Sequence, residues 1–272
     1  MNSMNETQHL RAQYRDASNL RRRIALHDLY SVNPVRWQPW IFDQIVFAPG
    51  MRLLELGCGP GTLWRSNDGR LPPGVSFTLS DFSPGMAATA RCNLADLGGF
   101  VFTVADAVAL PFASGRFDIV VANHMLYHAS DLSRALHEIG RVLRPGGTLY
   151  ATTNGAAHLV ELDELREGLI PHQPIREATA SFMLENGRSA LEKIFSSVEL
   201  RLHEDELRVT DVEPLVEYER SRAFIASENR PVPPETLEAY AERAAAALEE
   251  AGGVLHVSKE SGLFIAHKSR AR

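Results

Sequence analysis

The residues that most clearly suggest chemistry are three glycines, Gly57, Gly59 and Gly61, which follow a short apolar stretch. Glycine has no Cβ, so the backbone can turn sharply there and come close to a ligand. A buried strand, a glycine turn and a helix start at Thr62 would form a nucleotide-binding crevice at the end of a parallel sheet. A dinucleotide-binding fingerprint would need glycine at position 62, and a phosphate-binding loop would need a lysine after the last glycine. The chain has Thr62 there, so it matches neither pattern. Glu55 would repel a pyrophosphate and suits a cationic ligand.

Two further acids follow apolar segments that predict strands. Asp81 ends the segment 75–80, and Asp106 ends the segment 100–105. An acid at the end of the second strand, about 20 residues past the glycine loop, can hold both hydroxyls of a ribose. Glu55, Asp81 and Asp106 therefore lie at the carboxyl ends of the first three predicted strands.

The pattern E-x-G-x-G-x-G after a strand resembles the first motif of the class I S-adenosylmethionine (SAM) dependent methyltransferases. The string from Leu79 to Met86 closely matches the family pattern after the second strand. The turn Arg144-Pro145-Gly146-Gly147 before a strand is another family hallmark. The resemblance covers roughly residues 50–153 and implies SAM as the methyl donor, with S-adenosylhomocysteine (SAH) as the product. The alternative for the glycine loop alone is an ordinary strand–helix turn.

The resemblance implies a role for each matching residue. Gly57 would contact the methionyl end of SAM through its backbone, Asp81 would hold the ribose, and Glu55 would order the loop and a water. Side chains after Asp81 would flank the adenine, or else belong to the core. The predicted cofactor-binding residues are Glu55, Gly57, Gly59, Gly61, Asp81, Phe82, Met86, Asp106, Ala107 and Asn123.

Methyl transfer from a sulfonium is an in-line displacement, so the protein mainly positions a nucleophile and excludes water. A base is needed only if the nucleophile arrives protonated. In phosphoethanolamine methyltransferases a histidine after the fourth strand pairs with a tyrosine of an N-terminal lid. The predicted catalytic residues are therefore His128, Tyr14 and His124. The alternative is that Tyr14 packs in the core and His128 caps the next helix. No third ligand accompanies the two histidines, so no metal is expected.

Apolar segments alternate with helical segments, which predicts an α/β fold with a doubly wound, mainly parallel sheet. The resemblance implies a Rossmann-like sheet of seven strands in the order 3-2-1-4-5-7-6, with the seventh antiparallel. We expect one domain over residues 1–272, an N-terminal helical lid in 1–48 and a substrate-cap insertion in 155–197. The segments 254–257 and 262–266 predict a closing pair of strands.

Composition narrows the class of protein. The chain has 272 residues, a net charge of −6 and 44% hydrophobic residues, which is ordinary for a globular protein. An acidic chain argues against a nucleic-acid partner. The two cysteines form no disulfide or metal pattern, and no apolar run approaches the roughly 18 residues of a membrane span. We expect a cytoplasmic monomer or homodimer that has no membrane partner.

Three functions are compatible with these residues. The first is a SAM-dependent methyltransferase that acts on oxygen or nitrogen, less often carbon, of a small organic molecule, such as a secondary metabolite. The second is a SAM-binding regulatory protein without transferase activity. The third is a protein or RNA methyltransferase. Base methylation of the N-P-P-[YF] type is disfavoured, because the fourth predicted strand ends in Asn123-His124-Met125-Leu126.

Overall fold

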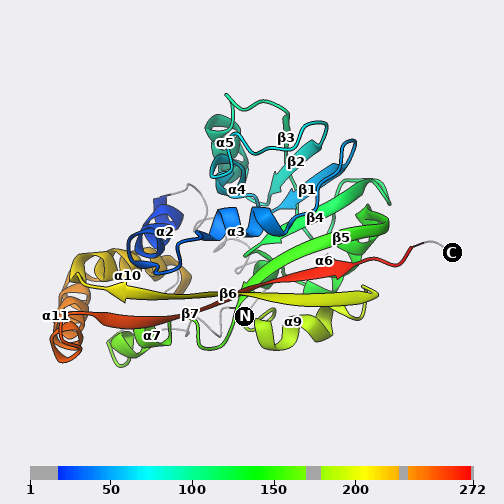
Figure 1. Cartoon of the computed structure of the whole chain (residues 1–272). Helices are drawn as coiled ribbons and strands as arrows, with labels where there is room; N and C mark the ends of the chain where they lie inside the picture. The colour runs from blue at the N-terminus through cyan, green and yellow to red at the C-terminus, as the bar shows by residue number, and fades with distance from the viewer. Residues whose placement is uncertain (1–17, 170–178, 227–231, 271–272) are drawn as a thin grey trace. The chain divides into compact units, whose positions relative to one another are not determined.

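The computed structural model describes residues 18–169, 179–226 and 232–270. Residue Tyr14 and the rest of the first 17 residues lie outside this part of the chain. The described elements are shown in Figure 1. In chain order they are α2 (Ser18–Tyr30), α3 (Trp37–Gln44), β1 (Arg52–Leu56), α4 (Thr62–Arg65), β2 (Ser76–Asp81), α5 (Pro84–Asn93), β3 (Phe100–Val104), β4 (Phe117–Asn123), the 3-10 helix η1 (Leu126–His128), α6 (Leu132–Val142), β5 (Leu143–Asn154), α7 (Val160–Arg166), α9 (Leu184–Leu191), β6 (Ser197–Val209), α10 (Val212–Ala226), α11 (Pro234–Glu250) and β7 (Leu255–His267).

The strands form one seven-stranded sheet in the order β3-β2-β1-β4-β5-β7-β6. The first five strands pair in parallel, and β7 runs antiparallel to β5. The predicted Rossmann-like, doubly wound fold and its strand order are therefore confirmed. Parallel strands place their carboxyl ends at one edge, so the residues after β1, β2, β3 and β4 meet there.

Helices cover both faces of this sheet. Leu53 and Val121 contribute to a core with α3, α4 and α5, whereas Leu54 and Val120 contribute to a core with α6 and α9. Successive residues of a strand point to opposite faces, so a strand buried on both sides reads as a continuous apolar run. This explains why the central strands β1 and β4 could be recognised from sequence.

The glycine loop lies at the topological switch point of the sheet. From β1 the chain continues to β2 on one side, whereas β4 on the other side of β1 continues to β5. Connections that leave in opposite directions open a crevice between the carboxyl ends of the two neighbouring strands. The loop that begins at Gly57 and the turn that begins at His124 lie at these two strand ends.

Two segments differ from the sequence prediction. The predicted closing pair of strands is one continuous strand, β7, because Lys259, Glu260 and Ser261 also have strand geometry. Strand β5 begins at Leu143, before the predicted turn at 144–147. The pairing with β4 jumps from Phe117 opposite Leu143 to Ile119 opposite Thr148, so the turn sequence is an irregularity inside the strand.

The described chain groups into two compact units. The sheet unit holds residues 37–155, 179–203 and 261–270, and the helical unit holds 18–36, 156–169, 204–226 and 232–260. The predicted lid segment 1–48 is thus divided, with α2 in the helical unit and α3 in the sheet unit. The predicted cap insertion 155–197 is likewise divided, with α7 in the helical unit and α9 in the sheet unit.

The helical unit contains buried charges. Arg166 and Glu219 are both fully buried, and Arg166 Nε lies 3.0 Å from Glu219 Oε2. Arg222, 4% exposed, donates a hydrogen bond of 2.9 Å to Asp163. These residues belong to α7 and α10, which also share apolar contacts with α2 and α11. The ion pairs therefore tie the helices of this unit together in a place that water does not reach.

We expect Glu219→Gln to lower the free energy of unfolding by about 3–5 kcal/mol, because it removes the nearest carboxylate from the buried Arg166 charge and leaves only the more distant Asp163. Glu217→Gln is the matched control on the same helix. Glu217 pairs with Arg22 at the surface, so its loss should cost less than about 1 kcal/mol. Denaturant unfolding of both variants checks this, and equal costs for the two would contradict it.

Candidate active site

The glycine loop needs its glycines for both conformation and space. Gly57, Gly59 and Gly61 have φ values of 63°, 53° and 79°, a region that other residues rarely adopt. A Cβ on Gly57 would lie 2.7 Å from the Cβ of Met125, which follows β4. A Cβ on Gly61 would lie 2.7 Å from Leu94. The loop backbone is therefore held close against the turn after β4, with no side chain of its own in the way.

Asp81, at the end of β2, is fixed by the glycine loop. Its Oδ2 accepts a hydrogen bond of 2.9 Å from the backbone of Gly59, and its Oδ1 accepts one of 2.8 Å from Ser83. The side chain is 9% exposed, and burial raises the pKa of Asp81, although these two backbone donors act against that rise. Each oxygen keeps a second lone pair, so the carboxylate can still accept hydrogen bonds from two hydroxyls.

Glu55 is buried in the strand below the loop and bonds to Trp64. The indole Nε1 of Trp64 donates a hydrogen bond of 2.6 Å to Glu55 Oε2. Burial raises the pKa of Glu55 to about 8; the hydrogen bond from Trp64 lowers it, and the nearby Asp81 raises it further. The Glu55 carboxyl therefore joins β1 to α4, which agrees with a role in ordering the loop.

Cys58, inside the glycine loop, is a buried free cysteine. Burial raises the pKa of the Cys58 thiol, and the neighbouring acids Glu55 and Asp81 raise it further. Since only the thiolate attacks carbon readily, this residue acts as a small apolar side chain.

The residues predicted to surround an adenine lie on two neighbouring strand ends. Met86 is 1% exposed, and Ser83 caps α5 by accepting a hydrogen bond from the Met86 backbone. Phe82 is half-buried, whereas Ala107 is buried. Asp106 Oδ1 accepts a hydrogen bond of 3.1 Å from the backbone of Val108, which closes the turn after β3. Met86 thus has a packing role in the core, and Phe82 and Asp106 stay partly open to solvent.

Asn123, which ends β4, and His124, which follows it, lie in a network of polar contacts. The Thr152 hydroxyl donates to Asn123 Oδ1 at 2.7 Å and accepts from the His124 backbone N–H at 2.9 Å. From α3, Trp37 Nε1 donates to the same Asn123 oxygen at 3.4 Å, and Asn123 Nδ2 donates to Gln38 at 3.3 Å. Three elements, α3, β4 and β5, therefore fix this strand end.

An aromatic cluster beside His124 was not predicted from sequence as part of the site. The Trp37 ring lies 5.1 Å from His124, 5.3 Å from Trp40 and 5.3 Å from His203, measured between ring centroids. Both tryptophans belong to α3. His203 comes from β6, far away in the sequence, so no spacing could have indicated that it joins them.

The predicted catalytic residues are only partly brought together. His128 ends η1, and its ring packs edge-on against Tyr127 at 4.5 Å. His124 lies four residues earlier, directly after β4. Tyr14 lies outside the described residues, so its pairing with His128 stays a prediction.

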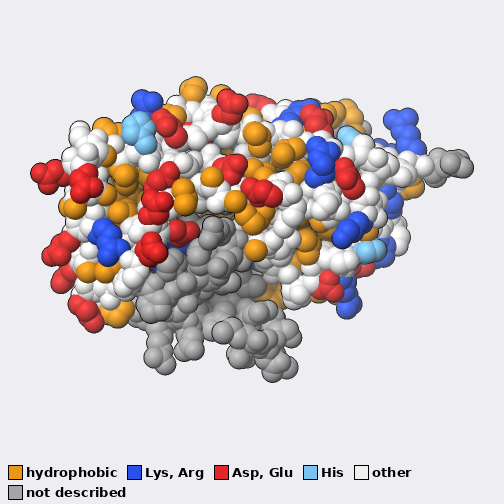
Figure 2. Space-filling view, turned by 90° about the horizontal axis from the view of Figure 1, so that it is seen from below, with side chains coloured by type: hydrophobic (Ala, Val, Ile, Leu, Met, Phe, Trp, Pro, Cys, Tyr) orange, Lys and Arg blue, Asp and Glu red, His pale blue; other side chains and the backbone are white. Residues whose placement is uncertain are grey.

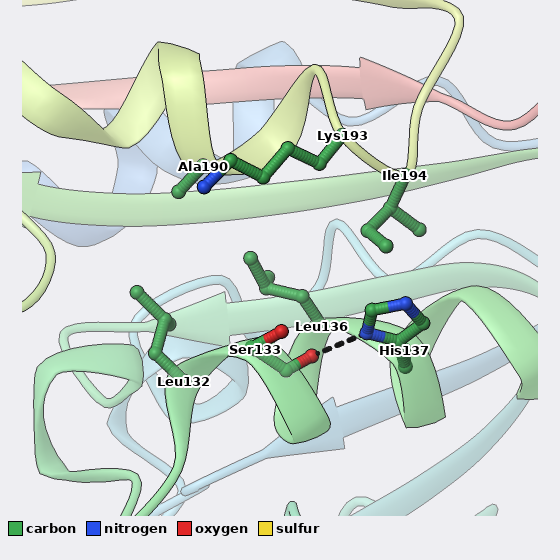
Figure 3. Close-up of a pocket in the computed structure, with 7 residues that line it drawn as sticks. All are labelled: Leu132, Ser133, Leu136, His137, Ala190, Lys193 and Ile194. Atoms are coloured by element: carbon green, nitrogen blue, oxygen red, sulfur yellow. Dashed lines mark hydrogen bonds between the residues drawn. The ribbon is translucent and has the colours of Figure 1, made fainter.

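A small pocket lies away from these strand ends, between α6 and α9 (Figure 3). Its apolar lining and small volume of about 90 Å³ suit packing better than a nucleoside. None of the predicted site residues lines it. The lining residues are Leu132, Ser133, Leu136, His137, Ala190, Lys193 and Ile194.

The donor set at the carboxyl edge fits SAM. Asp81 offers carboxylate oxygens to the hydroxyls of a ligand, and the glycine backbone leaves room for close approach. No group of three or more metal-ligating side chains occurs among the described residues.

Figure 2 shows acidic, basic and apolar side chains interspersed over the described part of one face, with no continuous basic stripe there. No helix in the described ranges is long and apolar enough to cross a membrane.

Comparison with known proteins agrees with this geometry. Residues 54–151 match a family model described as a methyltransferase domain. The resemblance of this chain to class I SAM-dependent methyltransferases is confirmed over the segment that carries the glycine loop and the first five strands. The match also supports SAM as the cofactor predicted from the motifs.

Curated relatives share this same part of the chain. The demethylmenaquinone methyltransferase of Beutenbergia cavernae is 37% identical over 130 residues, which are 47% of this chain and 52% of the relative. A malonyl-[acyl-carrier protein] O-methyltransferase of Enterobacter lignolyticus is 40% identical over 114 residues, 41% of this chain and 42% of the relative. The chain thus matches about half of each relative's length.

The fold has solved counterparts at low sequence identity. The [4+2]-cyclase SpnF has a TM-score of 0.55 and 20% identity, over 89% of this chain and 86% of the cyclase. This likeness supports the architecture alone, since one fold supports different reactions.

We expect stability to fall with rising pH through the ionisation of Glu55. Its pKa is about 8 when folded and 4.5 ordinarily, so the folded state holds a proton that the unfolded state loses. Between these two values each pH unit can cost up to about 1.4 kcal/mol. Glu55→Gln has no carboxyl group to ionise there. The free energy of unfolding of the variant minus that of the wild type should therefore increase from pH 5 to pH 8. Denaturant unfolding across that range checks this, and a constant difference would contradict it.

Proposed function

We propose that this protein transfers a methyl group from SAM to a small organic acceptor. The observation that carries the proposal is the position of Asp81, held by Gly59 at the carboxyl end of β2, beside the glycine loop of a matched methyltransferase domain. A buried carboxylate with free lone pairs suits two ribose hydroxyls. We assign the ribose to Asp81, the methionyl end to the backbone at Gly57, and the adenine to Phe82 and Asp106.

The protein's part in the reaction is to bind and orient the two reactants. When bound, SAM supplies an activated methyl group on a sulfonium. The loop of Gly57 to Gly61 allows close backbone approach, and Glu55 bonded to Trp64 holds the start of α4 below it. Positioning the acceptor in line with the carbon–sulfur bond and excluding water account for most of the lowering of the activation free energy. His124 and His128, which follow β4, are the candidate bases for an acceptor that arrives protonated.

The sequence and the relatives' names support a proposal for the acceptor class. We propose transfer to oxygen or nitrogen of a small molecule, such as a secondary metabolite. The relatives' names include an O-methyltransferase and an enzyme that acts on demethylmenaquinone. An aromatic ring carbon activated by a hydroxyl is therefore a further acceptor atom to assay.

A SAM-binding regulator without transferase activity is the main alternative. The two functions differ in turnover. Purified protein with labelled SAM and a panel of phenols, naphthohydroquinones, amines and carboxylic acids should release SAH faster with at least one acceptor class. SAH binding without acceptor-dependent release would contradict transfer and support the regulator.

Binding at Asp81 gives a separate test. We expect Asp81→Ala to weaken SAH binding by about 1.5–3 kcal/mol, because a charged acceptor for two hydroxyls is lost. Asp96→Ala is the control, since Asp96 is an exposed acid paired with Arg65. Titration calorimetry measures both variants. Wild-type affinity in Asp81→Ala would show that the ribose is not bound there.

A further inference from the structure

The backbone at His124 is in an unfavourable conformation. Among the described residues other than glycine, His124 and Leu159 alone have a positive φ, of 51° and 57°. An L-residue avoids this region because its Cβ approaches the backbone, and the conformation persists only where the surrounding structure forces it. Such residues concentrate at active sites. Of the two, His124 is the one at the switch point of the sheet.

Specific contacts force this conformation. The His124 backbone N–H donates to the Thr152 hydroxyl at 2.9 Å, and that hydroxyl donates to Asn123 at 2.7 Å. Thr152 lies opposite Asn123 in the pairing of β5 with β4. The turn after β4 is therefore tied back to the neighbouring strand, and the His124 side chain leaves the sheet at a fixed point.

The His124 ring is held by α3. The centroids of the Trp37 and His124 rings lie 5.1 Å apart, with an angle of 34° between the ring planes. The same indole donates a hydrogen bond to Asn123 Oδ1. Trp37 is in turn packed against Trp40 and against the buried His203. One tryptophan thus contacts both residues of the strand end and is itself immobilised by two aromatic neighbours.

His128 is placed differently. It lies at the end of η1, one turn beyond the strand, and its ring packs on its sequence neighbour Tyr127. Its backbone N–H donates to Met125 within the same turn. The contacts described above that come from α3 and β5 reach Asn123 and His124.

We infer that His124, rather than His128, receives the proton that the methyl acceptor releases, and that Trp37 positions His124 for this step. The inference rests on the proposed function. The acceptor's lone pair forms the new bond to the methyl carbon, the carbon–sulfur bond breaks, and its electron pair stays on sulfur. The acceptor's proton passes to the His124 imidazole and from there to water. The acceptor is therefore a protic one, such as a phenol or an amine.

The first test uses variants that keep the backbone. Asparagine tolerates the left-handed conformation, so His124→Asn should fold and bind SAH like the wild type. With an acceptor from the panel, its kcat should fall by about 10²–10⁴-fold. The matched control is His137→Asn, an exposed histidine on α6, which should keep the wild-type kcat. Loss of kcat in His128→Asn with retention in His124→Asn would overturn the inference.

Trp37 should act through His124. Trp37→Phe keeps an aromatic ring but removes the donor to Asn123, so kcat should fall by roughly tenfold with an unchanged KM for SAM. The double variant Trp37→Phe/His124→Asn should be no slower than His124→Asn alone, because the two residues act as one unit. Multiplying effects would show that Trp37 has an independent, structural role.

Chemical rescue separates a base from a structural residue. Glycine accepts a positive φ and leaves the space of the ring empty, so added imidazole should restore turnover to His124→Gly by at least tenfold and should not accelerate the wild type. Failure of rescue in a folded, SAH-binding variant would contradict the assignment.

A readout without turnover completes the test. In SAH-saturated protein labelled with ¹⁵N-histidine, the imidazole signal that is missing from His124→Asn should shift when the acceptor is added. A shift confined to the His128 signal would overturn the inference. Absence of SAH binding or of wild-type turnover would instead refute the proposed function, so the two failures are distinct.

Discussion

The close contact between the glycine loop after β1 and the turn after β4 is the constraint on which the site depends. Met125 lies where a Cβ on Gly57 would have to go, and the loop backbone at Gly59 holds the carboxylate of Asp81. A side chain at position 57 would push the two turns apart. The glycine loop after β1 therefore contacts the carboxyl end of β2 through Asp81 and the turn after β4 through Met125.

Charge in this site is controlled by burial. Glu55 lies beneath the loop with its pKa raised to about 8, and it uses its hydrogen-bonding capacity on Trp64 rather than on solvent. Asp81 is also buried but keeps two backbone donors that stabilise its charged form. The two acids thus have different roles, one in holding β1 to α4 and the other in presenting a carboxylate at the sheet edge.

Sequence alone could predict the parts of the fold that rest on local pattern. The glycine loop, the acids after the first three strands and the apolar runs of β1 and β4 are contiguous signals, and the strand order followed from the family they resemble. The helical unit could not be predicted, because it is assembled from segments that are far apart in the sequence. The contact of Trp37 with His203 could not be predicted either, because these residues are far apart in the sequence. The two predicted C-terminal strands form the single strand β7, because Lys259 and Glu260 between them also have strand geometry.

The most direct test of the central claim is a crystal structure of the protein with SAH. The ribose hydroxyls should lie within hydrogen-bonding distance of the Asp81 carboxylate, with the homocysteine end along the backbone at Gly57 and the sulfur directed toward the turn that contains His124. SAH bound elsewhere, or bound with its ribose away from Asp81, would contradict the assignment of the carboxyl edge of β1, β2 and β3 as the cofactor site.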